Sequence, residues 1–370
     1  MHLIQLVHTL NYGDAISGEA LAIQRMMSRQ GQTAWIHVVN AHEKVAEFSR
    51  SFHDLEEDIK KVLAVSGQVT VLMHYSIASP LNDIFRRLEG VRKVLLYHNL
   101  TPEKWYWGYN ARVVEHLIKG RQELPELVRL ADLVLADSIY NQQDLFQMCN
   151  AGSDSASPNS IEAKVLPLPL DEEKWAIETN RGIAEVLRNG ASRNFLHVGR
   201  FAPNKCIEDI VKAFYFYHHK IDKDSRLWLI GSDVDTEIYG FELRRLIFEL
   251  RLKEAVMMPG SLADCELKAF YENCDAYICM SEHEGFCVPL LEAMFFGLPV
   301  IAYNATAVGD TLGGAGLLLD VKDPACTAEL MELVVSDQEL RSELVSLGKA
   351  RAQVFAPTNF QALLREYFLG

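Results

Sequence analysis

Two glutamates, Glu284 and Glu292, lie eight positions apart in the stretch EHEGFCVPLLE, residues 282–292. The stretch joins an apolar run, AYICMS, to a helical pattern, PLLEAMFF. Pro289 fits the first helical position and Gly297 the stop, so Glu292 is expected near the first turn and Glu284 on the loop. Because backbone N–H groups at the positive end of a helix attract anions, we expect an anion site with one acid on either side. A capping loop with solvated acids is the alternative.

Two cations, Arg200 and Lys205, lie in the segment GRFAPNK, residues 199–205. The segment follows the strand pattern NFLHV and precedes the helical pattern IEDIVKAFYFYHH. Arginine binds phosphate as a fork and lysine as a point charge, so the pair before a helix suits a pyrophosphate. Solvated loop cations are the alternative. The chain has no G-x-G-x-x-G and no G-x-x-x-x-G-K-[ST], so dinucleotide-type and Walker-type phosphate binding lose their usual support.

Three histidines, His8, His74 and His98, lie near the ends of predicted strands in the first half of the chain. Ligands of open α/β sheets bind beyond the carboxyl ends of the strands, so the three together indicate a shared cleft. A packing or hydrogen-bonding role is the alternative for each one. A metal site is disfavoured because the histidines lie on separate strands without a local ligand pair.

An aromatic run, WYWGY at residues 105–109, follows His98 by a few positions. Such side chains stack on sugars or lie at membrane interfaces. A locally packed aromatic cluster is the alternative.

The composition narrows the class of protein. The 370 residues suggest about two domains, and the formal net charge of −14 argues against nucleic-acid binding. The seven cysteines form no C-x-x-C pair, which argues against a disulfide framework or a cysteine zinc site and favours a reducing cytoplasm. No apolar run is long enough for a transmembrane helix, and the N-terminal MHLIQLVHTLNYGD predicts a strand rather than a signal peptide.

Short apolar runs alternate with helical patterns, which predicts an α/β protein with a parallel sheet in each half. Strands are expected at 3–9, 34–39, 69–75, 93–99, 133–138, 194–200, 226–232, 256–260, 276–281 and 299–304. Residues 151–160, AGSDSASPNS, predict a surface loop, and the chain is expected to cross between domains near Pro167–Asp171. The last residues, FAPTNFQALLREYFLG, predict a helix whose packing partner the composition does not reveal.

With these motifs placed, the second half resembles the retaining glycosyltransferases of family 4, within glycosyl transferases group 1. Residues 259–320 follow that family's donor-site block, including its E-x7-E pattern, and HVGRFAPNK matches its Gly-Arg…Lys loop. YHN at 97–99 and GDAISGEA at 13–20 also fit. The resemblance implies the GT-B fold, in which two Rossmann-like doubly wound domains face a central cleft. It implies an acceptor-binding domain at 1–168, joined by a crossing helix at about 357–370, and a donor-binding domain at 169–356.

The resemblance also implies roles for the charged residues. Arg200 and Lys205 hold the donor pyrophosphate and stabilise the leaving nucleotide diphosphate. Glu284 contacts the donor sugar near the reacting carbon, and Glu292 binds the ribose. His98 reaches the donor sugar from the first domain.

Further donor contacts follow from the resemblance. Gly285 lies in the donor loop, and Phe286, Cys287 and Val288 offer backbone N–H groups to phosphate, while Gly18 lies in a loop facing the phosphates. Two departures from the family pattern occur. Cys287 replaces the usual Gly, so its backbone is expected to avoid mirror-image dihedrals. Positions 309 and 310 hold Gly and Asp, where Pro and Glu are common.

The expected function is retaining transfer of a sugar from a nucleotide diphosphate, UDP or GDP, to a glycan or lipid-linked acceptor. The process would be polysaccharide, lipopolysaccharide or exopolysaccharide biosynthesis. Such transfer builds negative charge on the departing phosphate, which cations and N–H dipoles stabilise. The resemblance implies that no metal or other cofactor is needed, and the sequence has no paired-carboxylate metal motif. The expected location is the cytoplasm, with peripheral contact to the inner face of the membrane left open. A GT-B sugar-nucleotide epimerase or sugar phosphorylase, and a non-catalytic nucleotide-sugar-binding module, remain alternatives.

Overall fold

The computed structural model describes residues 2–150 and 162–368, and the chain divides into two compact units. Unit 1 comprises Met1–Lys104, Arg112–Asp171 and Pro357–Gly370, and unit 2 comprises Trp105–Ala111 and Glu172–Ala356. The chain therefore passes from unit 1 to unit 2 after Asp171 and returns after Ala356. The surface loop predicted at 151–160 lies outside the described residues.

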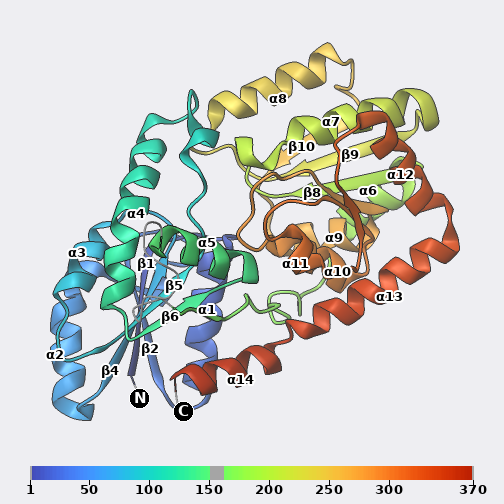
Figure 1. The fold of residues 1–370 in the computed structure, drawn as a ribbon. Coiled ribbons are helices and arrows are strands. Elements are labelled where there is room, and N and C mark those ends of the chain that lie inside the picture. The colour runs from blue at the N-terminus through green and yellow to red at the C-terminus, as the bar shows by residue number, and fades with distance from the viewer. Residues whose placement is uncertain (1, 151–161, 369–370) are drawn as a thin grey trace. The chain divides into compact units, whose positions relative to one another are not determined.

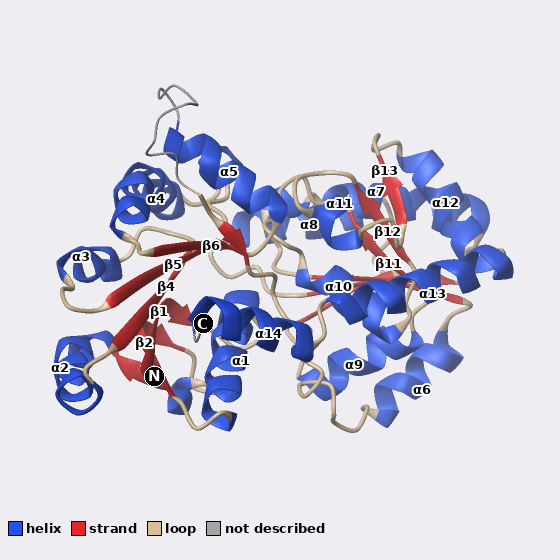
Figure 2. Ribbon diagram, turned by 60° about the horizontal axis from the view of Figure 1, so that its bottom comes forward, coloured by secondary structure: helices blue, strands red, loops and turns tan. Residues whose placement is uncertain are grey.

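Within its described residues, unit 1 holds a seven-stranded parallel sheet in the order β3-β2-β1-β4-β5-β6-β7 (Figure 1). Its strands are β1 (His2–Leu10), β2 (Thr33–Ala41), β3 (Ser49–Ser51), β4 (Val69–Tyr75), β5 (Arg92–Tyr97), β6 (Leu133–Ala136) and β7 (Lys164–Val165). Its helices are α1 (Ala15–Arg29), α2 (Leu55–Ser66), α3 (Pro80–Arg87), α4 (Ala111–Leu130), α5 (Ile139–Asn150) and α14 (Pro357–Phe368). Helices α1 and α14 lie on one face of the sheet, and α2, α3 and α4 lie on the other (Figure 2).

The covered sheet explains the sequence pattern of its central strands. All seven residues of β4, VTVLMHY, are buried, because helices cover the sheet on both faces. On one face, Ile23 and Met27 of α1 share a core with Leu3 of β1 and Leu72 of β4. The polar His74 at the end of β4 is therefore an exception inside an apolar strand, and such exceptions need partners.

The C-terminal helix α14 is part of unit 1. Its Phe360, Leu364 and Phe368 recur every four residues and join the core that contains Leu3. Its Tyr367 donates a hydrogen bond to the carbonyl oxygen of Val165 at 3.1 Å. The predicted helix is confirmed, and the sheet of unit 1 is its packing partner.

Within its described residues, unit 2 holds a six-stranded parallel sheet in the order β10-β9-β8-β11-β12-β13. Its strands are β8 (Arg193–Val198), β9 (Ser225–Ile230), β10 (Val256–Gly260), β11 (Ala276–Cys279), β12 (Val300–Tyr303) and β13 (Leu317–Leu319). Its helices are α6 (Arg181–Gly190), α7 (Ile207–Phe216), α8 (Glu237–Glu249), α9 (Asp264–Asn273), α10 (Val288–Phe296), α11 (Val308–Leu312), α12 (Pro324–Ser336) and α13 (Gln338–Val354). Side chains of α7, α8 and α12 share one core cluster with the strands.

Both sheets have the doubly wound strand order of Rossmann-like domains, so the predicted fold class is confirmed. In each sheet the strand order reverses beside the first strand, between β1 and β4 in unit 1 and between β8 and β11 in unit 2. Ligands of such sheets bind at this switch point, beyond the carboxyl ends of the strands. The two switch points are therefore the places to look for the predicted site residues.

The ten predicted strands are confirmed, and their ends differ from the prediction by at most two residues. The prediction missed β3, β7 and β13, which have only two or three residues and so show no alternating pattern. In the part of the chain that the structure describes, no helix is long and apolar enough to cross a membrane.

Candidate functional site

The switch point of unit 2 brings together the two charged segments that the sequence singled out. The segment with Arg200 and Lys205 follows β8, and the loop with Glu284 follows the neighbouring strand β11. Asn204 ties the two together: its side-chain amide donates to the carbonyl oxygen of His283 at 2.9 Å, and its own carbonyl accepts from the N–H of Glu282 at 2.9 Å. The two loops therefore form one supported unit.

Lys205 and Glu284 form a close ion pair at this point. The Lys205 Nζ lies 2.7 Å from each carboxylate oxygen of Glu284, and the two side chains are only 22% and 7% exposed. Burial alone would raise the pKa of Glu284, but the charge and hydrogen bonds of Lys205 outweigh burial and lower it. Likewise, burial would lower the pKa of Lys205, and the Glu284 carboxylate raises it. Both groups are therefore charged at neutral pH.

The backbone of Glu284 is held from the loop after β12. Its N–H donates to the Thr306 hydroxyl at 2.8 Å, and its carbonyl oxygen accepts from the N–H of Ala307 at 3.4 Å. The carboxylate is thus fixed at both its charged end and its backbone, which is the support that a precise ligand contact needs.

The structure corrects two expectations about the start of α10. The helix begins at Val288, so Pro289 is its second residue rather than its first. Cys287, the residue before the helix, has φ 77° and ψ 66°, which is the left-handed conformation that the sequence argument ruled out. The reversal of the chain between the loop and the helix requires this conformation, and the residue type does not prevent it. Gly297 ends the helix at φ 74°, as predicted.

The other donor-loop residues lie around this helix start. Phe286 is 5% exposed and packs edge-on against Phe355 at 5.3 Å between ring centroids. Its carbonyl oxygen accepts a hydrogen bond from the Thr311 hydroxyl at 2.5 Å. Gly285 precedes it, and Val288 opens α10, whose first N–H groups lack intrahelical acceptors, as in any helix. The segment before α10 is thus anchored by the packing of Phe286 and by its hydrogen bond to Thr311.

Glu292 lies further along α10 and has two partners that the sequence did not reveal. Its Oε1 accepts from Lys174 Nζ at 2.9 Å, and its Oε2 accepts from the Tyr271 hydroxyl at 2.8 Å. Burial and the Glu292 carboxylate raise the pKa of Tyr271 well above its ordinary value, so this hydroxyl stays a donor. Lys174 also lies 4.2 Å from the centre of the Trp175 ring.

Arg200 lies at the start of the loop that follows β8 and is exposed. Its guanidinium donates to the Tyr106 hydroxyl at 2.5 Å, and Tyr106 itself is buried within unit 2. Tyr109 is also packed and donates to Glu242 at 2.9 Å, whereas Trp107 is 61% exposed. The aromatic run is therefore a locally packed cluster at Tyr106 and Tyr109, and Trp107 remains available to a partner.

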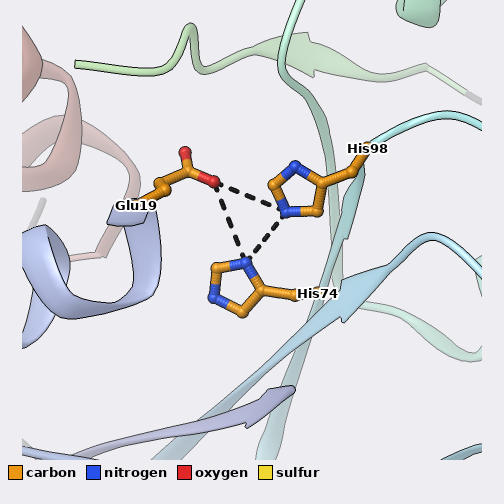
Figure 3. Close-up of side chains that lie close together, drawn as sticks. All are labelled: Glu19, His74 and His98. Atoms are coloured by element: carbon orange, nitrogen blue, oxygen red, sulfur yellow. Dashed lines mark hydrogen bonds and ion pairs between the residues drawn. The ribbon is translucent and has the colours of Figure 1, made fainter. Parts of the chain in front are cut away.

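The switch point of unit 1 holds a second buried polar group (Figure 3). The Nδ1 atom of His74 lies 2.9 Å from Nε2 of His98, and Oε2 of Glu19 lies 3.8 Å and 3.4 Å from these two atoms. The Nδ1 atom of His98 lies 3.3 Å from Asp137. His8 is not part of the group: its Nδ1 is hydrogen-bonded to the Ser79 hydroxyl at 2.9 Å.

Burial and neighbouring charges shift the pKa values of the ionisable groups at this switch point. Burial raises the pKa of Glu19 to about 8. Burial lowers that of His74 well below its ordinary value. For His98, burial would lower the pKa, but Asp137 and Glu19 raise it.

Gly18 lies in helix α1 and not in a loop, which corrects the prediction. The Asp14 carboxylate accepts a hydrogen bond from the N–H of Ser17 at 3.0 Å and so caps the helix, which therefore begins at Ala15. Gly18 then falls in the first turn, where a Cβ atom would meet nothing within 4 Å.

Sequence reasoning missed four residues of these two groups: Glu19, Asp137, Lys174 and Tyr271. Asp137 follows β6 directly, as His98 follows β5, so the same strand-end argument would have found it. Glu19 is a helical acid with no local signal, and Lys174 and Tyr271 are far from Glu292 in sequence.

Comparison with known proteins finds a family match in unit 2. Residues 180–351 match the profile of the family described as glycosyl transferases group 1. This range includes Arg200, Lys205, Glu284 and Glu292, and over it the chain is similar to this family.

The relatives of this chain differ in length. An uncharacterized glycosyltransferase of Methanocaldococcus jannaschii is 26% identical over 260 residues, which cover 68% of this chain and 70% of that protein. The serotype-specific mannosyltransferase WbdA of Escherichia coli is 30% identical over 375 residues, which cover 96% of this chain. The match covers only 42% of WbdA, so the chain spans less than half the length of that relative.

A solved structure has the same fold as this chain. The crystal structure of HepE from Anabaena, in complex with UDP-glucose, superposes with a TM-score of 0.74 at 18% identity and covers 100% of this chain and 99% of that one. This likeness places the two Rossmann-like units in the GT-B class. None of the three proteins described above is named as an epimerase or a phosphorylase, so that alternative gains no support.

Proposed function

We propose that the chain transfers a sugar from a nucleoside diphosphate sugar to a glycan or lipid-linked acceptor, with retention of configuration at the anomeric carbon. The observation that carries the proposal is the buried Lys205–Glu284 pair at the switch point of unit 2, beside Arg200 and the start of α10. One small region thus offers cations and N–H groups for a diphosphate and a carboxylate for a sugar.

The charges of the site divide the work of binding the diphosphate. Glu284 neutralises Lys205, whereas the Tyr106 hydroxyl that partners Arg200 carries no charge. The guanidinium charge of Arg200 therefore remains available to an anion. The N–H groups of Cys287 and Val288 at the start of α10 would add partial positive charge without any reorganisation.

In the proposed step, the bond between the anomeric carbon and the diphosphate oxygen breaks while the acceptor oxygen attacks from the same face. The departing diphosphate takes the acceptor's proton. Arg200, Lys205 and the α10 N–H groups stabilise the charge that builds on the diphosphate, so the step needs no metal on that group. Glu284 accepts hydrogen bonds from the sugar hydroxyls and holds the ring in place.

Glu292 is proposed to bind the ribose through its carboxylate. Lys174 and Tyr271 hold both oxygens in a fixed direction, and each carboxylate oxygen has a further lone pair for a hydroxyl donor. The contact between His98 and the donor sugar remains a prediction; in the structure the two ring nitrogens of His98 lie 2.9 Å from Nδ1 of His74 and 3.3 Å from Asp137.

Two substitutions test the proposal: Glu284→Gln and Lys205→Ala. Each should abolish most of the transfer, by about 100-fold or more, because each removes a charge that contacts the donor. Release of nucleoside diphosphate and sugar-bearing product would be measured with a donor panel that includes GDP-mannose, which the name of one relative gives, and UDP-glucose, which is bound in the HepE structure.

The matched control is Glu282→Gln. Glu282 lies two positions away and also pairs with a lysine, Lys322, at 2.8 Å, but it is 42% exposed and outside the proposed contacts. It should retain wild-type transfer. Wild-type rates in both Glu284→Gln and Lys205→Ala would contradict the proposal, as would donor binding with no transfer to any acceptor, which would favour a non-catalytic binding module.

A further inference from the structure

The hydrogen bonds around His74 fix where its proton lies. The Gln5 amide nitrogen donates to the carbonyl oxygen of Ala20 at 2.9 Å, so the amide oxygen of Gln5 faces Nε2 of His74, also at 2.9 Å. Because that oxygen is only an acceptor, Nε2 of His74 must carry the proton. If the His74 ring is neutral, its Nδ1 atom carries no proton, and the lone pair of this atom points at His98.

His98 is fixed from its other side in the same way. Its Nδ1 lies 3.3 Å from the Asp137 carboxylate, which also accepts a hydrogen bond from the Asn141 side chain. Nδ1 therefore donates to Asp137, and Nε2 faces Nδ1 of His74 at 2.9 Å. Two lone pairs do not face each other at this distance without a positive charge between them. The positive charge is either a shared proton or a metal ion.

Glu19 adds a third group to this pair. Its side chain is fully buried, and among the described residues neither of its carboxylate oxygens accepts a hydrogen bond. A proton shared by the two rings would satisfy their lone pairs only, and Glu19 would then need a further proton of its own to be neutral in this apolar interior. A metal ion would take Glu19 as a third ligand and satisfy all three groups at once (Figure 3).

We propose that Glu19, His74 and His98 bind one divalent metal ion of the zinc class inside unit 1. The three ligand atoms lie 2.9, 3.4 and 3.8 Å apart. Tetrahedral zinc, with bonds of about 2.0–2.1 Å to nitrogen and oxygen, places its ligand atoms roughly 3.3 Å apart, and two histidines with one glutamate form a known zinc ligand set.

The surroundings of the three ligands also match a metal site. Metal-binding histidines usually donate their other ring N–H to a carboxylate or to another oxygen acceptor, as His98 does to Asp137 and His74 to Gln5. The ligands come from α1, β4 and the end of β5, so the ion would connect a helix to the switch point of the sheet. This site would lie within unit 1 and would act on the fold of that unit.

The test uses the full chain, freed of metal by a chelator and then titrated with Zn²⁺ and with Co²⁺. We expect one tightly bound ion per chain and, for Co²⁺, the visible absorption of a tetrahedral nitrogen and oxygen site. Glu19→Gln and His74→Gln should lose the site, and Asp137→Asn should weaken binding by about 10–100-fold. His8→Gln is the matched control, because His8 lies in the same sheet and is outside the cluster, and it should bind like the wild type.

Two outcomes would overturn the proposal. One is the absence of stoichiometric metal binding by the wild-type chain, which would leave the shared proton as the explanation. The other is a Co²⁺ spectrum with an intense thiolate band, or unchanged binding in Glu19→Gln, which would place the ion elsewhere, for example near Cys279 and Cys287. The wild-type spectrum decides this even if a ligand variant fails to fold.

Discussion

Lys205 and Glu284 form a pair that supports the fold and, in the proposed function, also contacts the donor. Each is buried enough that its charge depends on the other, and both are aimed at the switch point where a ligand would lie. Removing one partner leaves the other charge with less support, which costs stability. If the pair contacts the donor as proposed, the same arrangement holds a cation and a carboxylate in place without reorganisation.

The pair predicts a specific pH dependence of stability. Glu284 has a pKa below its ordinary value of 4.5, because the Lys205 charge outweighs burial. Its stabilisation is therefore fully present above pH 4.5 and is lost as the pH falls through the lower folded-state pKa. Glu284→Gln should lower the free energy of unfolding by about 1–3 kcal/mol at neutral pH, and this difference should shrink on acidification.

Denaturant unfolding of the wild type and Glu284→Gln across a pH series measures this difference. Glu282→Gln is again the control, because its carboxylate is 42% exposed and should contribute little at any pH. A difference between wild type and Glu284→Gln that grows as the pH falls would contradict the assigned pairing.

Among the helices, α10 shows why a local rule can mislead. Cys287 was expected to avoid positive φ because it is not glycine, yet it has φ 77° at the start of the helix. The loop before it is fixed through Glu284 and Phe286, and the helix after it is fixed by packing in the core. Cys287 joins these two fixed segments and takes the backbone conformation that they impose. Its residue type determines only how much free energy this conformation costs.

The cost predicts the effect of substitutions at Cys287. Glycine adopts this conformation freely, so Cys287→Gly should offset the lost burial of the thiol and remain within about 1 kcal/mol of the wild type. A β-branched side chain is strained there, so Cys287→Val should lose about 1–3 kcal/mol. Thermal unfolding of the two variants tests the order, and equal stability would argue against the left-handed conformation.

The strands show which parts of the fold were predictable. Long buried strands such as β4 were predicted within two residues, because continuous apolar runs between helical patterns have few other interpretations. The three-residue β13 was missed because so short a segment has no pattern of its own and forms only by pairing with β12. The helix at the end of the chain was also predictable, but its place against Leu3 depends on contacts more than 350 positions apart.

For the chain as a whole, the sequence predicted where the charged loops lie better than it predicted which residues contact one another there. The E-x7-E and Gly-Arg…Lys motifs located the charged loops, because each motif is local and follows a strand. The partners of Glu292 and the Glu19–His74–His98 cluster were not predictable, because residues from distant elements meet only in the folded sheet. Contacts between residues that are far apart in the sequence can be identified only from the structure.

The central claim is that the chain transfers a sugar with retention of configuration, and one measurement tests it most directly. The wild-type protein is incubated with an active nucleoside diphosphate sugar and its acceptor, and the new glycosidic bond is followed by NMR from its first appearance. The account predicts a product with the donor's anomeric configuration and an equal amount of released nucleoside diphosphate. A product of inverted configuration, or donor consumption without an acceptor-linked product, would contradict it.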